Sequence, residues 1–289
     1  MYIKDIFKNN KPCVSFEIFP PKPTTPTGDV LEAAEKLSCL TPSYMSVTCG
    51  AGGSAAGEFD TIDTASYVKN TLKTEALAHL TCVLSGKEET DKSLARLKAE
   101  GIDNVLALRG DLPKGFTEPQ GDFKYACDLV SYIKANSDLC IGAACYPEGH
   151  IENPDTDDDL DRLKYKVDCG VDFLVTQLFF DNNMLYSFLY KAARKNIDVP
   201  VTAGIMPVMG RAQIQRMCNI SGATLTPKFK AMADKFHANP KALRQAGIAY
   251  ATEQIIDLIS NGVQNIHIYT MNKPDVAEQI MLNIQDIIR

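Results

Sequence analysis

The sequence predicts a closed (β/α)8 barrel, and its hydrophobic pattern supplies the evidence for this fold class. Eight short apolar, β-branched runs alternate with helical patterns along 289 residues, and the first seven runs start 28 to 36 residues apart. The runs are apolar on both faces, as parallel strands covered by helices require. No G-x-G-x-x-G turn follows the first run, which disfavours an open dinucleotide-binding sheet.

The eight runs are the expected strands, and each is followed by a helical pattern. We expect strands at residues 14–20, 44–50, 75–82, 104–111, 140–147, 173–180, 201–208 and 265–271. We expect helices at residues 30–40, 60–73, 87–99, 123–136, 157–169, 183–196 and 275–288. No linker rich in Pro, Gly or Ser divides the chain, so residues 1–289 are expected to form one domain.

The segment between the seventh and eighth runs is unusually long, because their starts lie 64 residues apart. Within it, Thr226-Pro227 and Asn239-Pro240 each combine a capping residue with a proline that suits the first helical position. The sequence therefore predicts two extra helices between strands 7 and 8.

Composition and charge narrow the function classes. The chain is 45% apolar and 23% charged, which is typical of a globular protein and not of a disordered one. Its formal charge is −6, and no basic block provides a surface for nucleic acid or an anionic membrane. Nine cysteines without a C-x-x-C pair, no leader-like N-terminus and no apolar stretch of ~20 residues predict a cytoplasmic protein without a membrane span.

Polar residues at the carboxyl ends of the runs are the candidates for a site, because barrel enzymes collect their reactive groups there. Glu17 lies between aromatic and aliphatic neighbours, where loss of water favours a protonated carboxyl that could donate a proton. With equal weight, Glu17 could be an interior carboxylate that pairs with a cation for structure. The pattern Arg109-Gly110-Asp111 on its own favours a strand end that turns at glycine with a solvated ion pair.

Histidines and glycines give weaker signals. His79, among apolar neighbours, is typical of a hydrogen-bonded core residue, whereas His150 follows Tyr146 in a predicted loop, where a functional role is more plausible. Neither the histidines nor the cysteines show metal-ligand spacing, so no metal site is expected. The glycine-rich stretch 49–54 lacks the lysine and spacing of a P-loop and is better interpreted as an active-site loop.

Eight segments, found in family order between residues 14 and 273, resemble the methylenetetrahydrofolate reductase family. Each segment alone is a weak signal, but their joint occurrence in this order is specific. The segments are SFEIFPP (15–21), SVTCGA (46–51), HLTC (79–82), LALRGDLP (106–113), ACYPEGH (144–150), KVDCG (166–170), TQLFFD (176–181) and HIYTMN (267–272).

The resemblance implies an oxidoreductase of one-carbon metabolism and methionine biosynthesis, acting on a CH–NH group. Such an enzyme binds FAD and reduces 5,10-methylenetetrahydrofolate to 5-methyltetrahydrofolate. Hydride transfer requires that the folate ring first opens to a 5-iminium cation, and Glu17 matches the family's general acid for this opening. Asp111 matches the family's aspartate near the flavin and the pterin, where its charge would stabilise the cation.

The resemblance also implies binding residues. Folate-binding positions are Gln177, Arg211, Tyr269 and Lys273. FAD-binding positions are Thr48, His79, Arg109, Gly110, Asp111, Ala144, Tyr146, His150, Asp159 and Lys166. Positive charge for the pyrophosphate of FAD would come from Arg109, Lys166 and His150.

This sequence departs from the family pattern at two of these positions. Arg211 stands where the family usually has an aromatic residue that stacks on the nicotinamide cofactor and on folate. Lys273 stands where many members have arginine, so a bidentate fork is replaced by a point charge. The chain ends at Arg289, which predicts the short bacterial type without the regulatory domain of larger relatives.

Alternatives remain open on the electron donor and on the reaction. NADH or NADPH is the default reductant, whereas Arg211 gives weight to electron supply by a partner subunit, ferredoxin or another flavoprotein. A flavin-free, pterin-binding barrel methyltransferase is a different enzyme class. A non-catalytic subunit is disfavoured by the retained Glu17, Asp111 and Gln177. The substrate is expected to be a folate, with or without a polyglutamate tail, and a homo-oligomer is compatible with the sequence.

Overall fold

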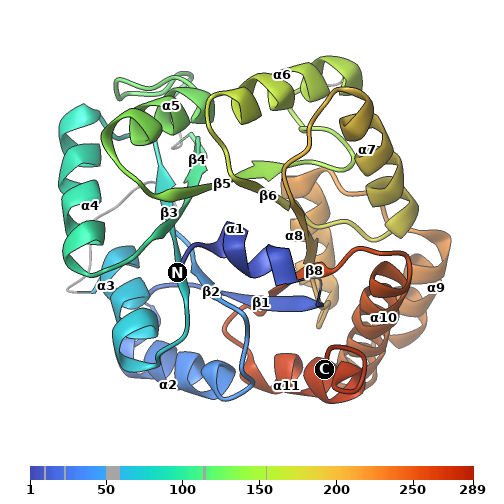
Figure 1. Cartoon of the computed structure of the whole chain (residues 1–289). Coiled ribbons are helices and arrows are strands. Elements are labelled where there is room, and N and C mark those ends of the chain that lie inside the picture. Colours follow the sequence, from blue (N-terminus) through green and yellow to red (C-terminus); the bar gives the residue numbers. More distant parts are fainter. Residues whose placement is uncertain (10, 23, 50–58, 113–114, 154) are drawn as a thin grey trace.

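The computed structural model describes residues 1–289 apart from 10, 23, 50–58, 113–114 and 154. Eight parallel strands close into a barrel in which each strand pairs with the next, and β8 pairs with β1 (Figure 1). The strands are β1 (Cys13–Ile18), β2 (Met45–Val47), β3 (Ala76–Thr81), β4 (Asn104–Leu108), β5 (Cys140–Cys145), β6 (Phe173–Thr176), β7 (Val201–Ile205) and β8 (Asn265–Tyr269). The predicted (β/α)8 barrel is confirmed.

Helices surround the barrel and cover the outer faces of its strands (Figure 1). Those that follow β1 to β6 and β8 are α2 (Thr27–Ser38), α3 (Thr61–Ser66), α4 (Lys87–Ala99), α5 (Ala126–Asn136), α6 (Thr156–Asp168), α7 (Asn182–Arg194) and α11 (Pro274–Ile284). A π-helical turn, Tyr67–Thr71, continues α3. Each lies within or close to the residues predicted for it.

The long segment between β7 and β8 contains three helices, not two. They are α8 (Arg211–Ser221), α9 (Pro227–Phe236) and α10 (Pro240–Ser260). Both predicted caps are present, because the side-chain oxygens of Thr226 and Asn239 accept hydrogen bonds from the backbone N–H groups of Phe229 and Ala242. The additional helix, α8, begins after Gly210, which has no capping side chain, so the cap signal that marks α9 and α10 is missing. None of the described helices is long and apolar enough to cross a bilayer.

The expected runs extend past the carboxyl ends of the strands. The sixth run, for example, continues through Leu178, Phe179 and Phe180, although β6 ends at Thr176. These residues are buried in the loop that follows β6, so the apolar pattern persists after the strand pairing has stopped. The residues just beyond each strand therefore belong to loops at one end of the barrel, where a (β/α)8 protein places its site.

Large apolar side chains fill the inside of the barrel towards the opposite end. Gly142 on β5 lies against this filling, because a Cβ there would come within 2.6 Å of the Phe173 ring and 2.9 Å of Leu106. The buried members of this cluster are Ile3, Cys13, Tyr44, Leu77, Leu106, Cys140, Phe173 and Val175. The barrel is therefore a packed core at this end and not a pore.

A short N-terminal helix covers the filled end. α1 (Ile3–Ile6) and the 3-10 turn Phe7–Asn9 lie across the barrel in Figure 1. Ile3 is fully buried, and its backbone N–H donates to Oδ1 of Asn104 on β4 at 2.8 Å. The ring of Phe7 meets Phe173 edge-on, with 5.6 Å between centroids. Ligands must therefore enter from the other end.

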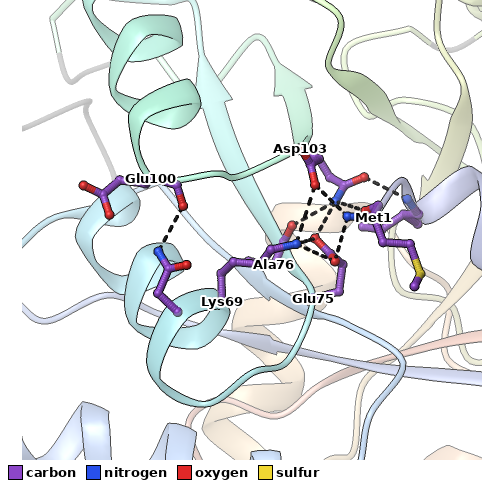
Figure 2. Close-up of polar contacts among 9 residues, drawn as sticks. Met1, Lys69, Glu75, Ala76, Glu100 and Asp103 are labelled. Atoms are coloured by element: carbon purple, nitrogen blue, oxygen red, sulfur yellow. Dashed lines mark hydrogen bonds and ion pairs between the residues drawn. The ribbon is translucent and has the colours of Figure 1, made fainter.

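Polar contacts tie the N-terminus to the edges of β3 and β4 (Figure 2). The amino group of Met1 donates to Asp103 at 2.6 Å and lies 3.2 Å from a carboxylate oxygen of Glu75. The ammonium group of Lys69, in the π-helical turn, donates to both oxygens of Glu75 at 2.6 and 2.7 Å. These contacts join the cover of the barrel to the strands beneath it.

Candidate active site

A cavity of 340 Å³ opens at the carboxyl ends of the strands. Its lining includes most of the residues singled out from the sequence: Glu17, Thr48, His79, Arg109, Gly110, Asp111, Ala144, Tyr146, His150, Gln177 and Tyr269. The remaining lining residues are Cys49, Thr81, Val83, Leu106, Leu108, Val175 and Thr176. Residues separated by up to 252 positions thus share one cavity, because all eight strands direct their carboxyl ends to this side.

Glu17 lies between two histidines on the wall of the cavity. Its Oε2 atom is 3.8 Å from Nε2 of His79 on β3 and 3.7 Å from Nε2 of His267 on β8. A serine holds each ring: Ser46 Oγ lies 2.6 Å from His79 Nε2, and Ser15 Oγ lies 2.8 Å from His267 Nδ1. Two serine–histidine pairs therefore flank one carboxyl group.

The neighbourhood of Glu17 contains little fixed positive charge. Burial lowers the pKa of His79 to about 4, so this imidazole is neutral at physiological pH. Within the described residues, no lysine or arginine forms an ion pair with Glu17. The interpretation of Glu17 as a structural carboxylate that pairs with a cation therefore gains no support from its neighbours.

Tyr269 closes the site beside Glu17, its neighbour in register across β8 and β1. The Tyr269 hydroxyl donates to the carbonyl of Thr176 on β6 at 2.6 Å, and its ring meets His267 edge-on. Gly204 on β7 makes this position possible, because a Cβ there would come within 2.6 Å of the Tyr269 hydroxyl. Burial raises the pKa of Tyr269 well above its usual value, so the hydroxyl stays protonated as a donor.

Arg109 lies at the strand-end turn expected for it, where Gly110 has a φ of +83°. Its ion-pair partner, however, is not Asp111. The guanidinium binds Glu152 with two parallel hydrogen bonds: Nη1 lies 2.6 Å from Oε2, and Nη2 lies 2.9 Å from Oε1. The ring of His150, in the same loop as Glu152, packs edge-on against Tyr146.

Two residues expected to bind the cofactor lie outside this cavity. Lys166 on α6 is partly buried, and its Nζ donates to the carbonyl of Ala144 at 2.7 Å, so it supports β5 from the helix side. Burial lowers the pKa of Lys166. Asp159 lines a second cavity of 200 Å³ that shares Tyr146 with the first, and burial raises the pKa of its carboxyl.

Comparison with known proteins identifies the family. The chain matches the sequence profile of methylenetetrahydrofolate reductase over residues 2–285. The chain belongs to the methylenetetrahydrofolate reductase family. It is 33% identical over 268 residues to 5,10-methylenetetrahydrofolate reductase of Pectobacterium carotovorum, which covers 92% of this chain and 88% of the relative. The Escherichia coli enzyme of the same name is 32% identical over the same shares.

Plant members of the family are longer. Methylenetetrahydrofolate reductase (NADH) 1 of Arabidopsis thaliana is 33% identical over 296 residues, which cover 98% of this chain but 50% of the plant protein. The chain thus spans about half the length of these relatives. Among solved structures, a Clostridium thermocellum protein that binds two copies of 5-methyl-5,6,7,8-tetrahydrofolic acid matches with a TM-score of 0.66. It covers 99% of both chains at 16% identity, so this likeness concerns the fold.

Of the two positions that depart from the methylenetetrahydrofolate reductase pattern, Lys273 is not among the described residues that line the cavity. Arg211 begins α8, and its side chain is outside the described part of the structure. Lys273 is exposed and precedes α11. The neighbouring residue Asn272 contacts the loop that follows β1. Its amide oxygen accepts a hydrogen bond from the Phe19 N–H at 2.8 Å.

Two further expectations concern loops and metals. Most of the glycine-rich stretch 49–54 lies outside the described residues, although Cys49 lines the cavity. In the described ranges, no group of three His, Cys, Asp or Glu side chains could hold a metal ion.

Sequence reasoning missed His267, its partner Ser15, and the second serine, Ser46. The alternation of side chains along the strands could have indicated the pair of Ser15 and His267. Ser15 and Glu17 are two residues apart on β1 and therefore face the same side, as do His267 and Tyr269 on β8. In the barrel these strands pair Ser15 with His267 and Glu17 with Tyr269. A polar residue at every second position of an otherwise apolar strand was the available clue.

Proposed function

We propose that this protein reduces 5,10-methylenetetrahydrofolate to 5-methyltetrahydrofolate, with FAD as the hydride carrier. The observation that carries the proposal is the arrangement at Glu17: an acid on the wall of a strand-end cavity, flanked by imidazoles. Asp111 and Gln177 line the same cavity, so an acid, a carboxylate and an amide can all meet one substrate. Membership of the methylenetetrahydrofolate reductase family supports the same reaction.

The donor set of the cavity fits FAD. Tyr146, Tyr269 and His79 offer aromatic faces and edges to a flat heterocycle, and Arg109 offers a cationic fork to phosphate. Gly110 lines the cavity where a Cβ would come within 3.1 Å of Thr81 and Val83, so the backbone itself forms the wall there. Bound FAD, once reduced, supplies the hydride to the methylene carbon of the folate.

Glu17 acts in this proposal as the general acid that opens the five-membered ring of the substrate. A proton given to the leaving N10 releases it and leaves a 5-iminium cation, the form that accepts hydride. His267 lies within 3.7 Å of Glu17 and is itself held by Ser15. The pair therefore places a polar ring beside the Glu17 carboxyl on the β8 side.

Asp111 and Gln177 bind and orient the folate in this proposal. Asp111 is exposed at the mouth of the cavity, where a carboxylate stabilises the positive charge of the iminium. The amide oxygen of Gln177 accepts a hydrogen bond from the Leu178 N–H at 2.9 Å. Its amide NH2 group makes no hydrogen bond within the described residues, which leaves it available to donate to the pterin.

NADH is the first candidate for the electron donor, because plant relatives carry it in their names. A specific observation favours a second candidate, an acidic electron-transfer protein. Residues 211–244 contain a single acid, Asp234, and seven basic residues, of which Lys228 and Arg244 form ion pairs with Glu253 and Asp275 outside the segment. The basic residues are Arg211, Arg216, Lys228, Lys230, Lys235, Lys241 and Arg244.

The basic segment lies at the cavity end of the barrel. α8 lies behind the barrel in Figure 1, on the opposite side from α1. Ile214 of α8 and Phe229 of α9 pack in one cluster with Tyr269, and the N–H of Thr224 between these helices donates to Glu148 in the loop after β5. An acidic partner attracted to this surface would approach the flavin from the open end.

The decisive experiment is anaerobic reoxidation of the flavin. The purified protein should be yellow with FAD absorbance, and after photoreduction it should be reoxidised when 5,10-methylenetetrahydrofolate is added. A colourless protein that binds pterin would favour the flavin-free methyltransferase. A yellow protein that the folate does not reoxidise would contradict the proposed reaction. Stopped-flow mixing of the oxidised protein with NADH, NADPH or reduced ferredoxin then identifies the donor.

A further inference from the structure

Three of the five N–H donors of the Arg109 guanidinium are engaged by groups of the protein itself. Nη1 and Nη2 donate to the two carboxylate oxygens of Glu152 at 2.6 and 2.9 Å, and Nε donates to the carbonyl of Gly110 at 3.2 Å. This is the parallel two-bond geometry that arginine also uses for phosphate. Arg109 is the cation on the cavity lining that the proposed function assigns to the diphosphate of FAD, and a carboxylate holds that position in this structure.

Glu152 reaches Arg109 from the solvent side of the cavity. It lies in the loop between β5 and α6, and its side chain remains 56% exposed while that of Arg109 is 26% exposed. The Glu152 backbone N–H donates to Nδ1 of His150 at 3.1 Å, and His150 packs edge-on against Tyr146 with 4.6 Å between ring centroids. The loop therefore fixes the Glu152 backbone on the cavity rim, while the carboxylate is free to leave towards water.

We propose that Glu152 is a built-in competitor for the diphosphate of FAD, and that it sets how tightly and how fast this protein binds its flavin. The inference rests on the proposed use of FAD. A carboxylate and a diphosphate would both bind the Nη1–H and Nη2–H groups of Arg109. The diphosphate of the cofactor must therefore displace the Glu152 carboxylate from these two groups. Glu152 also cancels the charge that would attract the cofactor to the cavity.

The strength of the pair decides the size of the effect. The hydrogen bonds from Arg109 lower the pKa of the Glu152 carboxyl, so it is ionised at neutral pH and competes at full charge. Ion pairs with one exposed partner are weak, and an exchange that gives up one such pair changes affinity by about two- to fivefold. The ion pair between Glu152 and Arg109 is thus strong enough to change the affinity for the cofactor and too weak to prevent its binding.

The test is flavin binding to apoprotein, measured by quenching of flavin fluorescence and by stopped flow. Glu152→Gln keeps the shape of the side chain and removes its charge. We expect this variant to bind FAD about two- to fivefold more tightly than wild type, with a faster association rate. Riboflavin, which lacks the diphosphate, should bind both proteins equally. Glu253→Gln is the matched control, because Glu253 on α10 forms an exposed ion pair with Lys228 on α9.

Several outcomes would overturn the inference. Weaker or unchanged FAD binding by Glu152→Gln would mean that Glu152 positions Arg109 or does nothing there. An equal effect on riboflavin would place the cause outside the diphosphate. In the background Arg109→Gln, the Glu152 substitution should lose its effect, and a persisting effect would also contradict competition. If wild-type apoprotein binds no FAD, the proposed function itself fails together with this inference.

Discussion

Glu17 has two properties that suit the proposed general acid: it lines the cavity, and polar rings flank its carboxyl group. Its side chain is only 14% exposed, and imidazoles lie on two sides. We expect Glu17→Gln to bind FAD and to be reduced normally, because the change keeps size and polarity. Reoxidation by 5,10-methylenetetrahydrofolate should slow by about 10² to 10⁴, the usual cost of losing an acid. Stopped-flow reoxidation measures this directly, and an unchanged rate would remove Glu17 from the acid role.

The buried side chain of His79, which lies beside Glu17, makes the free energy of unfolding depend on pH. Its pKa in the folded protein is about 4, against 6.5 in the unfolded chain, because burial disfavours the charged ring. The unfolded state therefore binds more protons between these values, and stability is lost as pH falls through this window. Between pH 7 and pH 5 this histidine should account for a loss of about 2 kcal/mol.

Urea denaturation at the two pH values tests this expectation. The loss of unfolding free energy between pH 7 and pH 5 should be smaller in His79→Asn than in wild type by about 2 kcal/mol. His237→Asn, which removes an exposed histidine at the end of α9, is the control and should behave as wild type. Equal losses in His79→Asn and wild type would show that the ring at position 79 is not held neutral by burial.

Among the elements, those with local signals could be predicted from the sequence. The caps at Thr226 and Asn239 act within one helical turn, so they marked the starts of α9 and α10 correctly. α8 begins after Gly210 without a side-chain cap, and its packing partners lie on other elements. No local sequence signal therefore predicted this helix. Strand ends were overestimated for a related reason. Burial, which the apolar pattern reports, continues past the last residue of the strand pairing.

α10 is fitted to the loop after β7 by a single glycine. A Cβ at Gly247 would come within 1.7 Å of the carbonyl oxygen of Val208, so Gly247→Ala must displace either the helix or the loop. We expect a loss of at least about 2 kcal/mol in unfolding free energy, measured by urea denaturation. Gly28→Ala in α2 is the matched control, since nothing lies within 4 Å of a Cβ there. A neutral Gly247→Ala would show that α10 does not pack this closely.

Across the whole molecule, the resemblance to the reductase family anticipated eleven cavity-lining residues, but not the contacts among them. The Ser15–His267 pair joins residues 252 positions apart, and Arg109 pairs with Glu152 from another loop and not with nearby Asp111. Such partners are brought together only when the barrel closes. Sequence patterns report the periodicity of each strand, whereas the register between β1 and β8 is a property of the closed sheet.

The charge distribution of the molecule predicts how a protein donor would behave. If an acidic electron-transfer protein reduces the flavin, reversal of exposed basic residues near the cavity end, Lys230→Glu with Lys235→Glu, should slow reduction several-fold and weaken its dependence on salt. Lys98→Glu on α4 is the control for charge alone. Stopped-flow reduction at several salt concentrations measures both effects. Equal loss of reduction by NADH would point instead to damage at the flavin.

Because α1 covers one end of the barrel, it has a consequence for the order in which the two substrates bind. With Ile3 and Phe7 seated on the packed interior, the proposed reductant and the proposed folate substrate must both enter at the strand-end cavity. If both reach the same face of the flavin, they cannot be present together, and each must depart before the other arrives. Steady-state rates should then give parallel lines in double-reciprocal plots, the pattern of a ping-pong mechanism, whereas intersecting lines would show that both substrates are bound at the same time.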